Sequence, residues 1–212
     1  MSADVLAERA RVQSQIEGKT LADTLAETVR QRGDEPAYSD KHHAPEGESW
    51  RTLTWSQTQE LARDVAAALI ELGLQPGQTV AIMATNRIEH YVADIGAMLA
   101  AATPMSIYNT LSPEQVAYVA GHARPAVVIL ENADHRGRWE KAIAEVDGVQ
   151  KVVMLDEDWD AFVAAGAAYR AANPEAVAER TAQITPDSPA TILYTSGTTE
   201  IQKEIIGRSL GI

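Results

Sequence analysis

The chain has 212 residues, 45% of them hydrophobic, and carries 30 acidic against 18 basic side chains for a formal net charge of −12. This apolar content is enough for the core of one large domain or two small ones. The acidic balance argues against nonspecific binding to nucleic acid or to an anionic membrane surface. It does not exclude a nucleotide, which needs only one local site rich in hydrogen-bond donors.

The chain has no cysteine, which excludes disulfides, thiolate zinc sites, iron–sulfur clusters and cysteine nucleophiles. The five histidines form neither a helical i, i+4 pair nor a group at ligand spacing, so we interpret them as solvated or capping residues and expect no metal site. They are His42, His43, His90, His122 and His135. The polar N-terminus lacks the apolar core of a signal peptide, and no stretch is long enough to cross a bilayer, so a soluble cytoplasmic protein is expected.

The N-terminal segment is expected to form helical structure followed by a β-hairpin. Helical spacing of apolar residues extends over residues 6–32. Two short extended runs, 37–40 and 49–54, flank the polar stretch 41–48, which predicts a hairpin with a long tip.

The middle of the chain repeats a strand–helix pattern. Thr54 with Gln57, and Ser112 with Gln115, form capping boxes that begin two helices, expected to end at Gly73 and Gly121 respectively. Apolar runs that do not alternate predict strands at residues 80–83, 126–130 and 149–155, with a short extended piece at 104–108. The remaining helices are expected at residues 86–101, 134–146 and 158–172.

Strands and helices in this order predict an α/β fold, in which residues 79–155 form a doubly wound, mainly parallel sheet with helices on its faces. The linker at residues 184–189, which contains two prolines, leads into a last strand at Thr191. We expect this strand to lie at or near an edge of the sheet.

The last strand leads into a sequence suited to binding an anion. After Tyr194 the chain continues as Thr195, Ser196, Gly197, Thr198 and Thr199, called the phosphate signature below. Hydroxyls and exposed backbone N–H groups supply donors, and glycine lets the backbone approach a ligand closely. Several donors on one small loop favour an anion, most plausibly a phosphate chain.

These residues resemble the signature loop of the adenylate-forming superfamily, which includes acyl-CoA synthetases, adenylation domains of nonribosomal peptide synthetases and luciferases. Further upstream stretches match in the same order, at residues 53–55, 68–83, 86–89 and 106–120. The stretch 107–115 is most similar to long- and medium-chain fatty acyl-CoA synthetases. The resemblance extends over about residues 21–199 and identifies the N-terminal part of such an enzyme.

The resemblance implies a reaction in which ATP and Mg²⁺ activate a fatty acid to an acyl-adenylate and pyrophosphate, after which coenzyme A displaces AMP. It assigns the β- and γ-phosphates of ATP to Thr195, Ser196, Gly197, Thr198 and Thr199, and an added positive charge to Lys203. Donors held in place stabilise the charge that develops on the leaving pyrophosphate. For a full-length parent, the resemblance also leaves open peripheral association with a membrane.

The sequence departs from the family directly after the signature. The family continues with glycine, a variable residue, proline, lysine and glycine, whereas this chain has Glu200, Ile201, Gln202, Lys203 and Glu204. Two carboxylates beside a triphosphate would repel it, and the loss of both glycines would stiffen the loop. The family's adenine, ribose and Mg²⁺ segments, and its catalytic lysine, have no counterpart in these 212 residues, so we expect no catalytic residue here and no activity of the chain alone.

We therefore divide the chain into residues 1–199, part of the N-terminal domain of an adenylate-forming enzyme, and a divergent tail, 200–212, interpreted as a frameshifted or joined end. A tail helix that covers a bare sheet edge is the alternative, and self-association through exposed edges is a further expectation. Two other interpretations of the chain stay open: a noncatalytic α/β module and part of a fatty acyl-AMP ligase. A P-loop kinase or ATPase is excluded because the G-x-x-x-x-G-K-[ST] pattern is missing.

Overall fold

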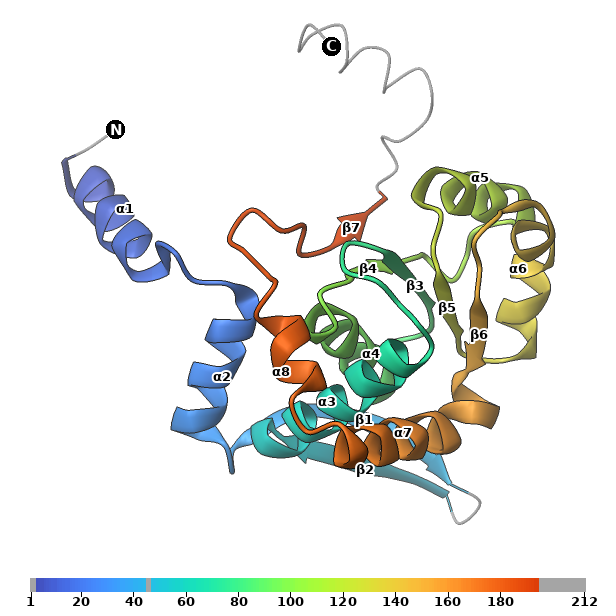
Figure 1. Cartoon of the computed structure of the whole chain (residues 1–212), viewed down its shortest axis with the longest axis horizontal. Helices are drawn as coiled ribbons and strands as arrows, with labels where there is room; N and C mark the ends of the chain where they lie inside the picture. Colours follow the sequence, from blue (N-terminus) through green and yellow to red (C-terminus); the bar gives the residue numbers. More distant parts are fainter. Residues whose placement is uncertain (1–2, 45–46, 195–212) are drawn as a thin grey trace, which may run out of the picture.

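The computed structural model describes residues 3–44 and 47–194, which form an α/β body from which the N-terminal helix projects (Figure 1). The phosphate signature, Lys203 and the rest of the tail lie outside the described residues. The helices of the described part are α1 Ala3–Ile16, α2 Leu21–Arg32, α3 Trp55–Glu71, α4 Ile88–Leu99, α5 Pro113–Ala123, α6 Ala133–Glu145, α7 Leu155–Ala172 and α8 Ala176–Thr181. The strands are β1 Pro36–Ala44, β2 Gly47–Thr54, β3 Thr79–Met83, β4 Thr103–Ser106, β5 Val127–Leu130, β6 Lys151–Met154 and β7 Ile192–Leu193.

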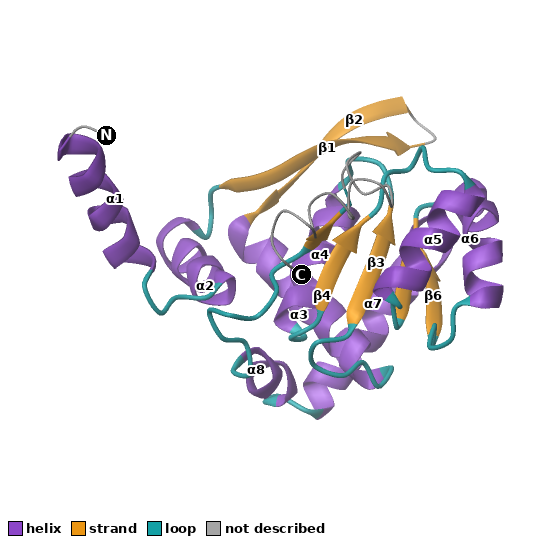
Figure 2. Ribbon diagram, turned by 90° about the horizontal axis from the view of Figure 1, so that it is seen from above, coloured by secondary structure: helices purple, strands orange, loops and turns teal. Residues whose placement is uncertain are grey.

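Five strands form a parallel sheet in the order β6-β5-β3-β4-β7 (Figure 2). The register places Ala81 of β3 opposite Met105 of β4 on one side and opposite Val128 of β5 on the other. From β3 the chain winds first to β4 and then back across β3 to β5 and β6. This arrangement confirms the predicted doubly wound sheet, and β7 lies at the edge of the described sheet, as expected.

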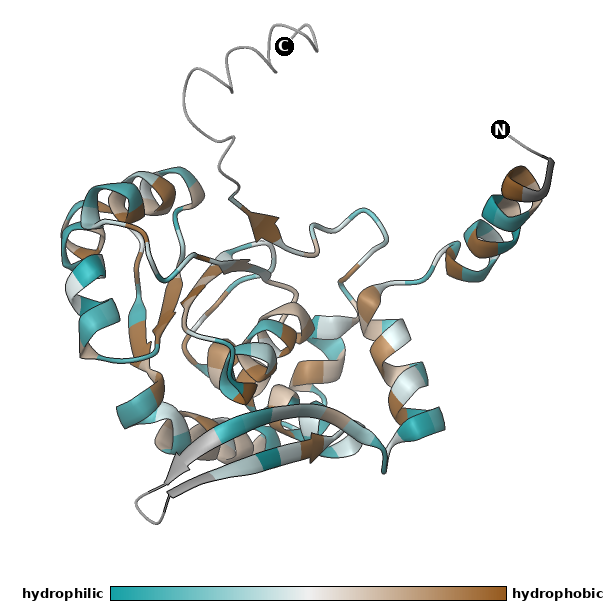
Figure 3. Cartoon of the chain, turned by 180° about the vertical axis from the view of Figure 1, so that it is seen from behind, coloured by the Kyte–Doolittle hydropathy of each residue, from teal (hydrophilic) through white to brown (hydrophobic). Residues whose placement is uncertain are grey.

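Each face of the sheet is covered by its own helices, because successive residues of a strand point to opposite sides. Ile82 and Ile129 belong to the apolar core formed with α3, α4 and α7, whereas Met83 and Leu130 belong to the core formed with α5 and α6. All four side chains are fully buried. In Figure 3 apolar colour marks much of the central sheet, whereas helix α6 is largely hydrophilic in colour.

Two glycines allow α3 to lie very close to its neighbouring helices. A Cβ atom on Gly96 of α4 would lie 2.5 Å from Cγ1 of Val65, and one on Gly166 of α7 would lie 1.8 Å from the carbonyl oxygen of Asp64. Real side chains do not tolerate such distances, so α4 lies against the Val65 side chain, and the backbone of α7 against that of α3, only because these two positions lack a side chain.

The separate β1–β2 hairpin is antiparallel and packs against α3 and α4. Tyr38 of β1 stacks on Tyr91 of α4 with ring centroids 4.7 Å apart, and it meets Trp55 of α3 edge-on at 5.9 Å. The predicted long tip at residues 41–48 is wrong: the strands continue through this stretch and the connection is only residues 45–46. The backbone of His42 and His43 is therefore part of β1.

Other boundaries also differ from the sequence-based expectation. The helical segment 6–32 is divided into α1 and α2, with Gly18 at a φ of +73° between them. The helix begun by Ser112 continues past Gly121 to Ala123 and ends at Arg124, whose φ of 46° is left-handed. Both predicted capping boxes are confirmed, at Thr54 and at Ser112.

The helix expected at residues 158–172 begins earlier, at Leu155, and the acidic run 156–158 forms its first turn. Carboxylates are favourable there because the amino end of a helix carries a partial positive charge. Among helices of the described part, none has the length and apolar character needed to span a membrane.

Candidate functional site

Strands β3, β4 and β7 end at the same edge of the sheet, and the residues around these ends line a cleft of about 540 Å³. Ligands of open α/β sheets bind outside the carboxyl ends of the strands. The polar side chains that line the cleft are those of Thr85, Asn86, His90, Ser106, Tyr108, Asn109 and Tyr194. No lysine, arginine, aspartate or glutamate is among the described residues that line it.

His90 and Ser106 form the best-defined polar pair of the cleft. His90 Nε2 lies 2.9 Å from Ser106 Oγ, and His90 Nδ1 lies 3.3 Å from the carbonyl oxygen of Thr85. A carbonyl oxygen only accepts, so this contact favours a proton on Nδ1, and Nε2 then accepts from the Ser106 hydroxyl. The pair presents hydrogen-bonding groups to the cleft at the carboxyl edge of the sheet.

Sequence reasoning missed both residues, since it interpreted His90 as solvated or capping. Their positions in the sequence could have indicated them. Ser106 is the last residue of β4, and His90 follows the loop after β3 in which Thr85 lies. Polar side chains at the carboxyl ends of neighbouring parallel strands converge on one edge.

Contacts with carboxylates hold the loop that follows β3, which forms one wall of the cleft. The backbone N–H of Thr85 donates to Glu131 Oε2 at 2.6 Å. Two residues later, Arg87 donates from Nε to Glu89 at 2.7 Å and from Nη1 to Asp156 at 2.6 Å. These contacts join the loop after β3 to the ends of β5 and β6, so the backbone of this wall is held from two sides.

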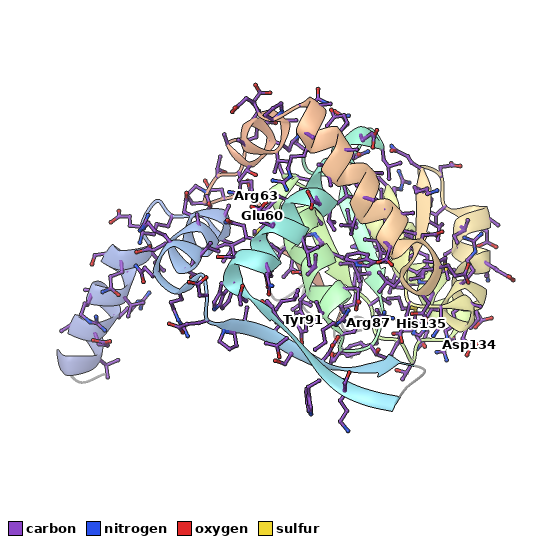
Figure 4. The ribbon with its side chains drawn as sticks, turned by 90° about the horizontal axis from the view of Figure 1, so that it is seen from below. Glu60, Arg63, Arg87, Tyr91, Asp134 and His135 are labelled. Atoms are coloured by element: carbon purple, nitrogen blue, oxygen red, sulfur yellow. The ribbon has the colours of Figure 1, made fainter. Side chains whose placement is uncertain are left out.

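The same ion-pair network reaches the hairpin, on the side of the body where Figure 4 shows Arg87 and Tyr91. Arg51 of β2 lies 2.6 Å from Asp40 of β1 and 2.6 Å from Glu89 of α4. Asp40 also accepts from the backbone N–H of Ile88 at 2.8 Å. Asp40 and Glu89 are buried, so each carboxylate needs these partners.

Burial raises the pKa of Glu89, but hydrogen bonds from Arg51 and Arg87 outweigh it and lower this pKa from 4.5 to about 2. For Asp40, burial likewise raises the pKa, and the hydrogen bonds from Arg51 and the Ile88 N–H bring it below its ordinary value. The hydrogen bond to Glu89 raises the pKa of Arg51. Both carboxylates are therefore charged at neutral pH, and the network joins hairpin, α4 and α7 as a charged unit.

The edge strand β7 brings the chain to the cleft. Tyr194, the residue directly before Thr195, lines the cleft, and its hydroxyl lies 2.5 Å from Nδ1 of His122 on α5. None of the predicted site residues (Thr195, Ser196, Gly197, Thr198, Thr199 and Lys203) lies within the described residues. The structure nevertheless shows where the residue before the signature lies: Tyr194 is at the carboxyl end of β7.

In the part of the chain that the structure describes, no group of three or more histidine, aspartate or glutamate side chains is placed to hold a metal ion. The carboxylates of the ion-pair network are paired with arginines instead.

A parallel sheet with helices on both faces and a polar cleft at its carboxyl edge places the chain in the class of doubly wound α/β proteins. The family model of the AMP-binding enzymes matches residues 25–203, and the chain belongs to this family. The match includes the phosphate signature and Lys203.

Two curated relatives are ligases. The human long-chain-fatty-acid–CoA ligase ACSBG2 is 30% identical over 197 residues, which cover 88% of this chain and 28% of that protein. The long-chain-fatty-acid–CoA ligase FadD15 of Mycobacterium bovis is 29% identical over 154 residues, or 71% of this chain and 25% of the relative.

Among solved structures, that of VinN with L-aspartate superposes with a TM-score of 0.66 at 22% identity, covering 85% of this chain and 41% of VinN. This likeness supports the fold. The chain spans less than half the length of each of these three proteins.

Proposed function

We propose that this chain is the N-terminal part of an ATP-dependent fatty acid–CoA ligase. In the proposed reaction a fatty acid and ATP give acyl-AMP and pyrophosphate, and the thiol of coenzyme A then displaces AMP to give acyl-CoA. The observation that carries the proposal is the family match, which continues through the signature to Lys203 at the point where β7 delivers the chain to the cleft. The long-chain ligases among the relatives support a fatty acid as the acyl substrate.

In this proposal residues 1–199 form part of the ligase's N-terminal domain. Thr195, Ser196, Gly197, Thr198 and Thr199 hold the β- and γ-phosphates, and Lys203 adds positive charge. Backbone N–H and hydroxyl donors at fixed positions stabilise the pyrophosphate as it leaves. The described cleft, which has no charged lining residue, would contact an uncharged part of a substrate.

We propose that the phosphates of ATP hold Mg²⁺; among the described residues no group of three or more carboxylates or histidines is placed to bind it. Mg²⁺ would neutralise phosphate charge. We also propose a cytoplasmic location for the parent.

A noncatalytic α/β module is the second candidate, and a specific observation favours it for this chain. Glu200 and Glu204 stand where the family has glycines, and their carboxylates would repel a triphosphate. We accordingly expect the chain alone to be inactive.

An assay of ATP–pyrophosphate exchange with palmitate and MgATP tests this expectation. The chain alone should give no exchange above a heat-denatured control. Exchange by the purified 212-residue protein would show that the acyl-adenylate forms without further segments, and the proposed inactivity would then be wrong.

A signature-restored variant, Glu200→Gly/Gln202→Pro/Glu204→Gly, tests the phosphate assignment separately. It replaces the three departures with the residues of the family and leaves Lys203 in place.

A further inference from the structure

The strand that leads into the signature has few backbone contacts of its own. Strand β7 is two residues long and pairs only through Ile192 with Met105 and through Leu193 with Ser106. Leu193 is 67% exposed, and within the described sheet β7 has no neighbour on its other side. A two-residue edge strand contributes little stability by itself, so its position depends on side-chain contacts.

Tyr194 supplies the strongest of these contacts. Its hydroxyl lies 2.5 Å from His122 Nδ1, and the two rings meet edge-on at an angle of 89° with centroids 5.8 Å apart. The Tyr194 ring also packs against the apolar core between the sheet and helices α5 and α6. Thr191 adds a hydrogen bond to the carbonyl oxygen of Pro104 at 3.2 Å, at the start of the same segment.

His122 is a firm point of attachment because helix α5 is fixed at both ends. Its capping box at Ser112 satisfies the first turn, and Arg124 closes the last turn by donating its backbone N–H to the carbonyl of Ala120. Along its length α5 packs against α6 and buries Val116 and Val119. His122 stands in the last turn of this helix, 72 positions before Tyr194.

We propose that His122 is a positioning residue for phosphate binding, which holds Tyr194 and thereby fixes the backbone from which the signature continues. This inference rests on the proposed function. Donors that act on a phosphate are effective only when their positions are set in advance, because ordering them at the moment of binding costs free energy.

Amide hydrogen exchange at Ile192, Leu193 and Tyr194 tests the anchor without any ligand. His122→Leu removes the hydrogen-bonding partner of Tyr194 and Tyr194→Phe removes the hydroxyl, and each should raise the exchange rates of these amides by about fivefold, since a hydrogen bond contributes about 1 kcal/mol. His122→Asn keeps an oxygen near the position of Nδ1 and should retain rates close to those of the wild type. Amides of the central strand β3 serve as the internal control and should not change.

Equal β7 exchange rates in the wild type and His122→Leu would overturn the proposal. Equal increases in the β7 exchange rates of His122→Leu and His122→Asn would also overturn it. They would show that the size of the histidine side chain, and not its hydrogen bond, holds β7.

Pyrophosphate affinity, measured by calorimetry in the signature-restored variant, tests the link to binding. Adding His122→Leu should weaken pyrophosphate at least about fivefold, whereas His122→Asn should restore the affinity. An unchanged affinity in a protein that binds pyrophosphate would overturn the positioning role. If the signature-restored variant does not bind at all, the proposed phosphate site is contradicted, and the positioning role that rests on it falls as well. The exchange rates would still show whether His122 anchors β7.

Discussion

Glu89 is the centre of the ion-pair network that joins the hairpin to the wall of the cleft. Its carboxylate lies 2.6 Å from Arg51 and 2.7 Å from Arg87, and its side chain is 6% exposed. The substitution Glu89→Gln keeps the shape of the side chain and removes its charge. Among the described ion-pair partners, Arg51 then keeps Asp40, and Arg87 keeps Asp156 and, at 4.0 Å, Glu131.

The pKa of Glu89 gives the size of the effect. A decrease from 4.5 to about 2 corresponds to about 3 kcal/mol of folding free energy, because one pKa unit is worth about 1.4 kcal/mol. Removal of one partner from a buried ion pair costs a similar amount, about 3 kcal/mol or more. We therefore expect Glu89→Gln to lower the free energy of unfolding by about 3 kcal/mol at pH 7.

This contribution depends on pH with a definite sign. The folded-state pKa of Glu89 is lowered, so its stabilisation is complete above pH 4.5, the unfolded value, and is lost as the pH falls towards about 2. The wild type should lose stability over this window more steeply than Glu89→Gln, and the two should converge at its acidic end. Asp40 shares Arg51 with Glu89, and the Glu89 charge adds to burial in raising the pKa of Asp40, so the difference between the two curves reports the Glu89 carboxylate together with its effect on Asp40.

Urea unfolding followed by tryptophan fluorescence between pH 7 and pH 2.5 measures these curves, and the exposed Glu140 of α6 provides the control. Glu140→Gln should change stability by less than about 0.5 kcal/mol and keep the pH dependence of the wild type. If Glu89→Gln shows the same pH slope as the wild type, the network does not hold Glu89 charged in the way that its geometry indicates.

Three further predictions test the packing and the sheet edge. Gly166→Ala should destabilise the fold by about 3 kcal/mol, because the added Cβ would meet the Asp64 carbonyl. Gly137→Ala, whose Cβ meets nothing within 4 Å, should stabilise the fold slightly. Thermal unfolding of both variants measures these two effects. Ser112→Ala should cost about 1 kcal/mol through loss of the helix cap, and an unchanged urea midpoint would contradict it. Leu193→Lys should reduce concentration-dependent association at the β7 edge in sedimentation experiments, and equal association of the variant and the wild type would refute that role of the edge.

Much of the fold could be predicted because local signals and the required packing agree. The capping box at Ser112 fixes where α5 begins, and the uninterrupted apolar run of β5 matches a strand that is buried on both faces. The sequence also indicates a parallel sheet, since each strand is followed by a helix long enough to cross over it.

The sequence-based predictions are wrong where contacts between distant segments determine the structure. The hairpin continues through the polar stretch 41–48 because its two strands pair with each other, which the composition of either strand does not show. Helix α5 passes Gly121 because nothing in its surroundings requires a turn there, and it ends where Arg124 adopts a left-handed conformation. His90 and Ser106 are 16 positions apart, so only the assembled sheet edge brings them into contact.

We propose that residues 195–199 are the phosphate signature of an AMP-binding enzyme and that the residues after Thr199 impair it. Titration calorimetry with pyrophosphate compares the wild-type chain with the signature-restored variant, and with the same variant carrying Lys203→Ala. Restoration should tighten binding at least about tenfold by removing two repelling carboxylates and returning two glycines, and Lys203→Ala should reverse most of the gain. Equal pyrophosphate affinity in all three proteins, each folded with the thermal stability of the wild type, would contradict the assignment.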